Sequence, residues 1–244
     1  MIRSTHLSLL VTESPKAMAL KAAEHIESRC REALEKRGRF TLAISGGKTP
    51  IELFRLLSTP EWVKRITWEK TSLYWVDEHC VPTDSPESNY GMARSELLGH
   101  IPLTHYYRIK GEDDPVRAAD QYERFLKEHF ELAEGEFPRF DCILLGVGDD
   151  GHIGSIFPGY TAATEKKRLV VDQYLHSLKS SRVTMTLPVL NSSRSIIFMA
   201  SGREKHPILS ISLNLMSEPT LPAQMVRPNK GQLCWIIDEA AYRG

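Results

Sequence analysis

Short runs of apolar and β-branched residues alternate along this chain with longer stretches typical of helices. The short runs predict strands over residues 6–11, 39–45, 71–77, 140–148, 182–187, 195–201 and 232–238. The stretches between them predict helices that begin near Pro15, Pro50, Ser88, Pro115 and Lys205. Residues 15–37 have proline at the front and Gly38 just beyond the end, which is the usual punctuation of a helix.

This alternation predicts an α/β fold, in which a doubly wound, mostly parallel sheet carries helices on both faces. No repeat, low-complexity tract or long linker is visible, so we expect a single domain over residues 1–244. Ligands of such sheets bind outside the carboxyl ends of the strands. Segments 45–50, 77–90 and 146–159 stand at such ends and are rich in glycine and polar residues. We expect these three loops to meet at one edge of the sheet.

The composition and net charge of the chain limit the classes of partner that we expect it to bind. The chain has 31 Lys plus Arg and 31 Asp plus Glu, which gives a formal net charge of zero. A balanced chain has no overall attraction for nucleic acid or an anionic membrane. We find no signal peptide and no run long enough to span a bilayer. The four cysteines lie far apart, and Cys80 beside His79 is weak evidence for a metal. We therefore expect a cytoplasmic protein with reduced thiols and no bound metal.

The first polar loop, SGGKTP at residues 45–50, joins a predicted strand to a predicted helix. Its glycines allow close approach of a ligand, and the start of a helix offers free N–H groups that suit a phosphate. The candidate phosphate ligands are Ser45, Gly46, Gly47 and Lys48. A nucleotide P-loop is excluded because that motif needs glycine where Leu42 stands. Taken alone, the loop is equally compatible with an ordinary tight turn.

The second loop, DEHCVPTDSPESNY at residues 77–90, brings two acids to the end of a predicted strand. Asp77 and Glu78 could contact substrate hydroxyls or transfer protons. Spacing alone favours a different interpretation. In it, both acids are solvated loop residues and Ser88-Asn89 only caps a helix.

The third loop, GVGDDGHIGSIFPG at residues 146–159, contains a G-x-G-x-x-G pattern that can indicate a dinucleotide site. That interpretation is weak, because the glycines come past the middle of the chain and Asp149 and Asp150 would repel a pyrophosphate. The spacing of Asp150 and His152 is more informative. A histidine titrates near neutrality, and a neighbouring carboxylate can fix its tautomer and stabilise its protonated form. We interpret the pair as a candidate acid–base unit, the alternative being a polar surface histidine.

Five segments together resemble the 6-phosphogluconolactonases of the pentose phosphate pathway, over nearly the whole chain. They are LAISGGKTP, YWVDEHCVPTDSPESNYGMARSELL, FDCILLGVGDDGHIGSIFPG, SRVTMTLPVLNSSRSIIFMASGREK and LPAQMVRPNKGQLCWIIDEAA. The resemblance implies cofactor-free hydrolysis of 6-phospho-D-glucono-1,5-lactone to 6-phosphogluconate in the cytoplasm. It implies that His152 is the general base, with Asp150 orienting it or holding a sugar hydroxyl. We expect a monomer or a small homo-oligomer.

Glucosamine-6-phosphate deaminases are similar in fold and share the SGG-x-TP and DGH segments. In that family DGH leads into AFNEP, whose Glu belongs to the catalytic acid–base set. Phe157 corresponds to that Glu in this chain and cannot move a proton, so the lactonase interpretation is favoured. A non-catalytic sugar-phosphate sensor on the same fold is the third hypothesis.

Both families imply a phosphate clamp from the second half of the chain, which points to Arg182 and Lys205. The lactonase pattern usually reads DER in the second loop, where this chain has His79 after Asp77 and Glu78. A neutral histidine has fewer donors and a shorter reach than a guanidinium. Either His79 partly replaces the arginine, or another cation such as Lys48 supplies the contact.

Overall fold

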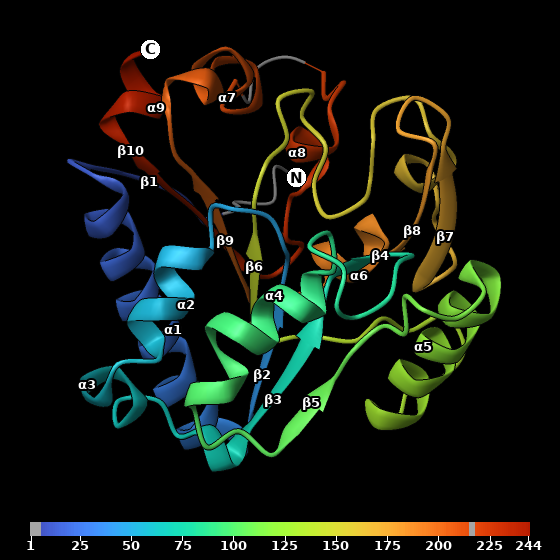
Figure 1. Cartoon of the computed structure of the whole chain (residues 1–244), viewed down its shortest axis with the longest axis horizontal. Coiled ribbons are helices and arrows are strands. Elements are labelled where there is room, and N and C mark those ends of the chain that lie inside the picture. Colours follow the sequence, from blue (N-terminus) through green and yellow to red (C-terminus); the bar gives the residue numbers. More distant parts are fainter. Residues whose placement is uncertain (1–5, 215–217) are drawn as a thin grey trace.

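The computed structural model describes residues 6–214 and 218–244. Its centre is a seven-stranded sheet in the order β1-β10-β9-β6-β2-β3-β5, in which all neighbours pair in parallel (Figure 1). The strands are β1 (His6–Thr12), β2 (Phe40–Ile44), β3 (Thr71–Trp75), β5 (His105–Tyr107), β6 (Cys142–Leu145), β9 (Ser195–Ala200) and β10 (Gln232–Asp238). The expected parallel sheet is confirmed.

A second, three-stranded antiparallel sheet stands beside the first. Its order is β4 (Asp77–His79), β8 (Ser180–Met185) and β7 (Val170–Leu175). The predicted strand at 182–187 belongs to this sheet, and the sequence did not predict β5 or β7. Val76 joins the two sheets, because its N–H donates to Ile44 of the large sheet and its carbonyl accepts from Met185 of the small one.

The five predicted helix starts are met within one residue, four further short helices were not predicted, and the described residues form nine helices in all. They are α1 (Pro15–Arg37), α2 (Ile51–Leu57), α3 (Pro60–Val63), α4 (Asn89–Glu96), α5 (Pro115–His129), α6 (Leu187–Asn191), α7 (His206–Ser212), α8 (Pro222–Met225) and α9 (Glu239–Arg243). Short 3₁₀ turns cover Trp68–Lys70, Leu98–His100, Thr161–Ala163 and Arg203–Lys205. At the start of α1 the Ser14 hydroxyl accepts from the N–H of Ala17, and at its end Gly38 takes the left-handed conformation, with φ 71°.

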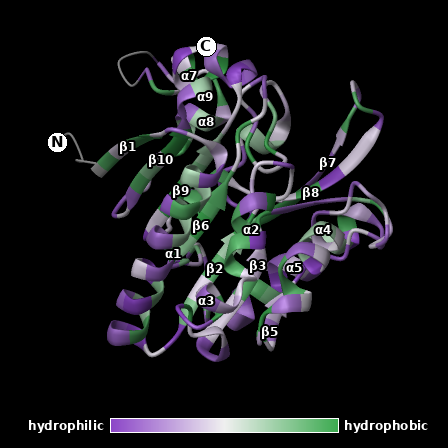
Figure 2. Ribbon diagram, turned by 60° about the vertical axis from the view of Figure 1, so that its left-hand side comes forward, coloured by the Kyte–Doolittle hydropathy of each residue, from purple (hydrophilic) through white to green (hydrophobic). Residues whose placement is uncertain are grey.

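The core follows from strands that are buried on both faces. Every residue of β2, β6 and β9 is buried, which accounts for their continuous apolar runs. The rings of Phe198 and Trp235 stack with centroids 4.0 Å apart between β9 and β10. Figure 2 shows these hydrophobic strands inside, with hydrophilic residues along the helices around them. The large sheet holds the polar loops that follow its strands at one edge.

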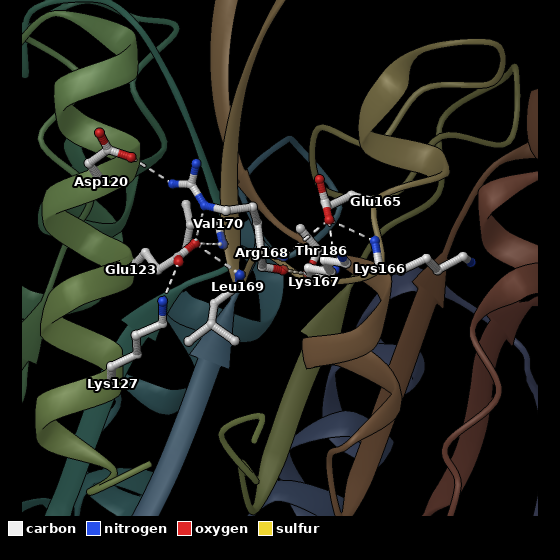
Figure 3. A network of polar contacts seen from close by, with 10 residues as sticks. All are labelled: Asp120, Glu123, Lys127, Glu165, Lys166, Lys167, Arg168, Leu169, Val170 and Thr186. Carbon is white, nitrogen blue, oxygen red and sulfur yellow. Dashed lines mark hydrogen bonds and ion pairs between the residues drawn. The ribbon is translucent and has the colours of Figure 1, made fainter. Parts of the chain in front are cut away.

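A buried carboxylate ties α5 to the smaller sheet (Figure 3). Glu123 accepts hydrogen bonds from Lys127 on its own helix and from Arg168 beyond it, at 2.6 and 2.7 Å. It also accepts from the backbone N–H groups of Leu169 and Val170 at the start of β7. Its side chain is only 8% exposed. These hydrogen bonds hold the first residue of β7 in place against α5.

We expect Glu123→Ala to lower the free energy of unfolding by about 3 kcal/mol, because it leaves the buried N–H groups of Leu169 and Val170 without their acceptor and removes a carboxylate shared by two cations. Urea unfolding followed by circular dichroism measures the loss. Asp120→Ala is the matched control, since Asp120 pairs with the same Arg168 but is 51% exposed. An exposed pair contributes about 0–1 kcal/mol. Equal losses in the two variants would contradict the assigned role of the buried carboxylate.

A second prediction concerns His25, which lies on α1 with Nε2 2.9 Å from the hydroxyl oxygen of buried Ser195. Burial, assisted by Arg29, lowers the pKa of His25 from 6.5 to about 4. The unfolded chain therefore binds a proton more readily, so stability falls as pH drops from about 6.5 towards 4. We expect this histidine to contribute about 2–3 kcal/mol to the fall.

The measurement is the free energy of unfolding of His25→Gln at several pH values between 4 and 7. The variant should show a flatter pH dependence than the parent protein. His176→Gln, on an exposed turn, is the control and should keep the parental slope. An unchanged slope in His25→Gln would show that other groups govern acid sensitivity.

Candidate active site

A cavity of about 560 Å³ opens at the carboxyl ends of β2, β6 and β9. The three polar loops meet there, as their positions in the sequence predict. The lining side chains and backbone come from Ser45–Thr49, Asp77, His79, Asn89, Gly146–Asp149, His152, Gly154, Ser201, Glu204 and Lys205, with Pro15, Met18 and Glu52 at one side. Of the candidate residues named from the sequence, Glu78, Asp150 and Arg182 are not in this lining.

The first loop brings backbone close to the cavity because glycine allows it. Gly47 has φ 90°, a conformation that side chains disfavour. A Cβ on Gly46 would lie 1.8 Å from Oδ1 of Asn89, so only glycine fits above this amide. Ser45 is buried, and its hydroxyl has no hydrogen-bond partner among the described residues. This hydroxyl is therefore available to a ligand, and the exposed Lys48 stands beside it.

The acids of the second loop are not solvated loop residues, which corrects the interpretation that spacing alone favours. Asp77 and Glu78 lie in β4 and are 3% and 2% exposed. Asp77 Oδ2 accepts a 2.7 Å hydrogen bond from the hydroxyl of Ser155, whereas buried Oδ1 has no partner among the described residues. Asp77 lines the cavity, so this unpaired oxygen is a candidate acceptor for a ligand hydroxyl.

Glu78 supports the site from outside the cavity lining. Its carboxylate accepts hydrogen bonds from the backbone N–H groups of His79, Asn89 and Tyr90, at 2.9, 2.7 and 2.8 Å. Burial raises the pKa of Glu78 to about 7, although these three donors act in the opposite direction. The contacts position the start of α4 and with it Asn89, whose side-chain amide donates to the carbonyl of Asp77.

His79 lines the cavity where the family pattern has arginine. Burial, and after it the charge of Arg182, lowers the pKa of His79, which favours the neutral ring. Its Nδ1 lies 3.7 Å from a carboxylate oxygen of Glu87. At neutral pH this position therefore offers a hydrogen bond but no full positive charge.

Arg182 is not in the cavity wall, contrary to its expected place in the phosphate clamp. It lies on β8, directly opposite His79 in the antiparallel ladder. One guanidinium nitrogen donates to the hydroxyl of Ser180 and the carbonyl of Ser181, which holds the side chain beside the small sheet. The guanidinium would have to leave these partners to reach a ligand phosphate.

His152 and Asp150 form a pair, as their spacing predicts. Nδ1 of His152 lies 2.5 Å from Oδ1 of Asp150, and the same oxygen accepts from the His152 backbone N–H at 3.1 Å. Burial raises the pKa of Asp150, but the contacts with His152 outweigh it and the net pKa is lowered. The carboxylate is therefore ionised at neutral pH and fixes the ring with Nε2 as its remaining nitrogen.

The imidazole of His152 is held on two further sides. Its ring stacks on Phe157 with centroids 4.1 Å apart and planes 21° apart. Elsewhere around the ring, a Cβ on Gly148 would lie 2.0 Å from Nδ1 and Cε1, so glycine makes room for the imidazole. The second glycine of the G-x-G-x-x-G pattern thus accommodates the histidine, and the structure gives the pattern a role without a dinucleotide.

Lys205 reaches the cavity from the 3₁₀ turn Arg203–Lys205. Its ammonium donates to the carbonyl of Val147 at 2.9 Å and to Oδ1 of Asp149 at 2.6 Å. The side chain of Lys205 is 17% exposed, whereas that of Asp149 is 74% exposed. The lysine is therefore held at the cavity, and the carboxylate of Asp149 is a solvated partner that a ligand anion could replace.

Sequence reasoning missed three residues of the site. Asn89 supports Gly46 and lines the cavity, while Ser88 is the helix cap and accepts from the N–H of Gly91. Ser155 holds Asp77. Ser201 lines the cavity, and its hydroxyl donates to Asp238 at the end of β10. Serine and asparagine are common in turns, so no local signal separates these from ordinary turn residues.

Within residues 6–214 and 218–244, no group of three or more His, Cys, Asp or Glu side chains is arranged to hold a metal ion. Over the same residues, no helix is long and apolar enough to cross a membrane.

Comparison with known proteins finds the same fold and similar sequences. The model of the family described as glucosamine-6-phosphate isomerases/6-phosphogluconolactonase matches residues 13–235. A 6-phosphogluconolactonase from Rattus norvegicus is 38% identical over 240 residues, covering 96% of this chain and 91% of the relative. One from Nostoc sp. is 33% identical over 229 residues, covering 92% of each. The structure of 6-phosphogluconolactonase from Trypanosoma cruzi superposes with a TM-score of 0.88 at 28% identity, covering 99% of this chain and 98% of the other.

Proposed function

Since the chain belongs to the glucosamine-6-phosphate isomerase/6-phosphogluconolactonase family, we propose that its cavity hydrolyses 6-phospho-D-glucono-1,5-lactone to 6-phosphogluconate. The observation that carries the proposal is the fixed His152–Asp150 pair in a polar cavity that also contains two lysines. The cavity, of about 560 Å³, is within the usual range for a small-molecule site.

The substrate phosphate would bind between the first loop and Lys205. Support comes from the free hydroxyl of Ser45, the exposed backbone at Gly46 and Gly47, and the ammonium groups of Lys48 and Lys205. A phosphate attracts Lys205 more strongly than the solvated carboxylate of Asp149 does. This remote contact would place the lactone carbonyl at the other side of the cavity, towards His152.

The sugar hydroxyls would meet the second loop. Oδ1 of Asp77 is a buried acceptor without a partner among the described residues, and a ligand hydroxyl would satisfy it. His79, held neutral by burial, would donate or accept one further hydrogen bond. These contacts orient the ring and take no part in proton transfer.

The proposed reaction uses Nε2 of His152, the ring nitrogen that Asp150 does not contact. Nε2 takes a proton from a water molecule, and the hydroxide formed attacks C1 of the lactone. The tetrahedral intermediate collapses with cleavage of the bond between C1 and the ring oxygen. The imidazolium returns the proton to that oxygen, so the products are a carboxylic acid and a hydroxyl. Asp150 stabilises the imidazolium throughout, and no cofactor is required.

Glucosamine-6-phosphate deamination is the alternative within the same family. It would need a carboxylic acid where this chain has Phe157, and that ring is stacked on the imidazole of His152. The aromatic ring cannot exchange a proton with a substrate, so the hydrolase is favoured.

The test is to generate the phosphorylated lactone freshly and follow its loss with and without protein, subtracting spontaneous hydrolysis. Acceleration supports the hydrolase. Binding of 6-phosphogluconate without acceleration would indicate a sugar-phosphate sensor, and release of ammonia from glucosamine 6-phosphate would indicate the deaminase. Either result would overturn the proposal.

A further inference from the structure

A second cavity, of about 440 Å³, lies at the opposite edge of the large sheet from the candidate active site. Three segments that lead into parallel strands form its floor, namely Arg139 and Asp141 before β6, Arg194 before β9, and 230–232 at the start of β10. The last two turns of α1 form its wall. Because parallel strands separate their amino and carboxyl ends, this cavity is distinct from the first.

The lining is strongly basic although the whole chain is neutral. Two carboxylates, Glu32 and Asp141, face six cations, so four positive charges are in excess. The cations are Arg29, Lys36, Arg37, Arg139, Arg194 and Lys230. Those from α1 stand at spacings of seven and eight residues from Arg29, which places them on one face of the helix.

The two carboxylates are already shared among four of the cations. Glu32 pairs with Arg29 and Lys36, each at 2.7 Å. Asp141 lies 2.8 Å from Arg37 and 3.2 Å from Arg194 through its Oδ1. Arg139 and Lys230 have no carboxylate partner among the described residues. The positive excess is therefore not neutralised inside the cavity.

The cluster is built into the fold. Asp141 is 4% exposed, and its Oδ2 accepts from both the N–H and the hydroxyl of Thr41. The backbone N–H of Arg194 donates to Phe140, and the N–H of Gln232 donates to Arg194, so the floor segments are bonded to one another. Nε of Arg29 and of Arg37 are buried donors with no hydrogen-bond partner among the described residues. Burial, and after it the like charges of Arg139 and Arg37, lowers the pKa of Arg194.

We propose that this cavity is a binding site for a small multivalent anion that carries phosphate or pyrophosphate. The forked guanidinium groups suit phosphate oxygens, and the side chains of Arg139 and Lys230, which have no carboxylate partner among the described residues, supply further charge. None of the described residues that line it is aromatic, so the site recognises the anionic group and not a nucleobase. Its concave shape favours a small molecule over an acidic protein surface.

The test is a calorimetric titration with pyrophosphate at low ionic strength, followed by thermal unfolding with and without the anion. The variant is Arg139→Ala with Lys230→Ala, which removes exposed side chains and leaves the buried pairs of Asp141 intact. The matched control is Lys64→Ala with Arg124→Ala, exposed cations outside both cavities. Lys205→Ala is titrated as well, because pyrophosphate can also enter the candidate active site.

We expect Kd for pyrophosphate to rise about tenfold or more in Arg139→Ala with Lys230→Ala, corresponding to loss of charge-assisted hydrogen bonds. The rise in Tm that pyrophosphate produces should shrink in parallel. The control and Lys205→Ala should keep this binding event, and lactone hydrolysis should be unaffected in the double variant. Binding that is absent in the parent protein, or lost only in Lys205→Ala, would overturn the proposal, as would binding of a glutamate-rich peptide in place of pyrophosphate.

Discussion

His152→Ala is expected to reduce kcat for lactone hydrolysis by about 10²–10⁴-fold, the range that general acid–base catalysis usually supplies. The physical reason is that Nε2 is the proposed acceptor of a proton from water, while Asp150 holds the other nitrogen at 2.5 Å. KM should change little, because the proposed phosphate contacts lie on other loops. The measurement is the initial rate of lactone loss, corrected for the spontaneous reaction.

Two further variants separate a chemical role of His152 from a structural one. Asp150→Asn should lower kcat, because the imidazolium that forms during the proposed reaction loses its ionised partner. His176→Ala, on the exposed turn between β7 and β8, should be indistinguishable from the parent. Near-parental turnover in His152→Ala would remove this residue as the base.

Lys205→Ala is expected to raise KM for the phosphorylated lactone by about 10- to 100-fold, the equivalent of one charge-assisted hydrogen bond. Lys205 is fixed at the cavity by Val147 and Asp149, and it is the least exposed cation placed there. The effect on kcat should be smaller, because the ammonium lies on a different loop from His152. Steady-state kinetics over a wide range of substrate concentration measures both constants.

The neighbouring acid supplies the control for this second prediction. Asp149→Asn removes the competing carboxylate and leaves the ammonium in place, so KM should stay the same or fall. Lys230→Ala removes a lysine at the opposite edge of the sheet and should leave KM unchanged. A KM that is the same in Lys205→Ala and the parent would exclude Lys205 from the phosphate clamp.

The parts of the fold that could be predicted are those in which one physical cause dominates. Strands β2, β6 and β9 are buried on both faces, so their apolar runs are continuous and easily recognised. By contrast β5 has three residues, mostly exposed, and β7 alternates buried with exposed positions around Asp172 and Gln173. Such short or half-exposed strands form because a neighbour pairs with them, and local sequence does not contain the neighbour.

The same distinction applies to the site. The glycines and the Asp150–His152 pair were identifiable because each residue type suggests its own chemistry, whereas Lys205 was identified only through the family resemblance. The burial of Asp77 and Glu78 could not be predicted from local sequence. It depends on the antiparallel pairing of β4 with β8, whose residues lie about a hundred positions further along the chain. The position of Arg182 outside the cavity wall depends on that same pairing. Tertiary contact, not spacing, decides these cases.

The space left for the imidazole of His152 has a genetic consequence. A Cβ at position 148 would collide with the ring, and one at position 46 would collide with Asn89. Any missense change in either glycine codon adds at least that carbon, whatever amino acid it encodes. Any replacement at these two positions therefore displaces the side chain of His152 or of Asn89. We expect drift at these two codons to be confined to silent changes for as long as the site is under selection.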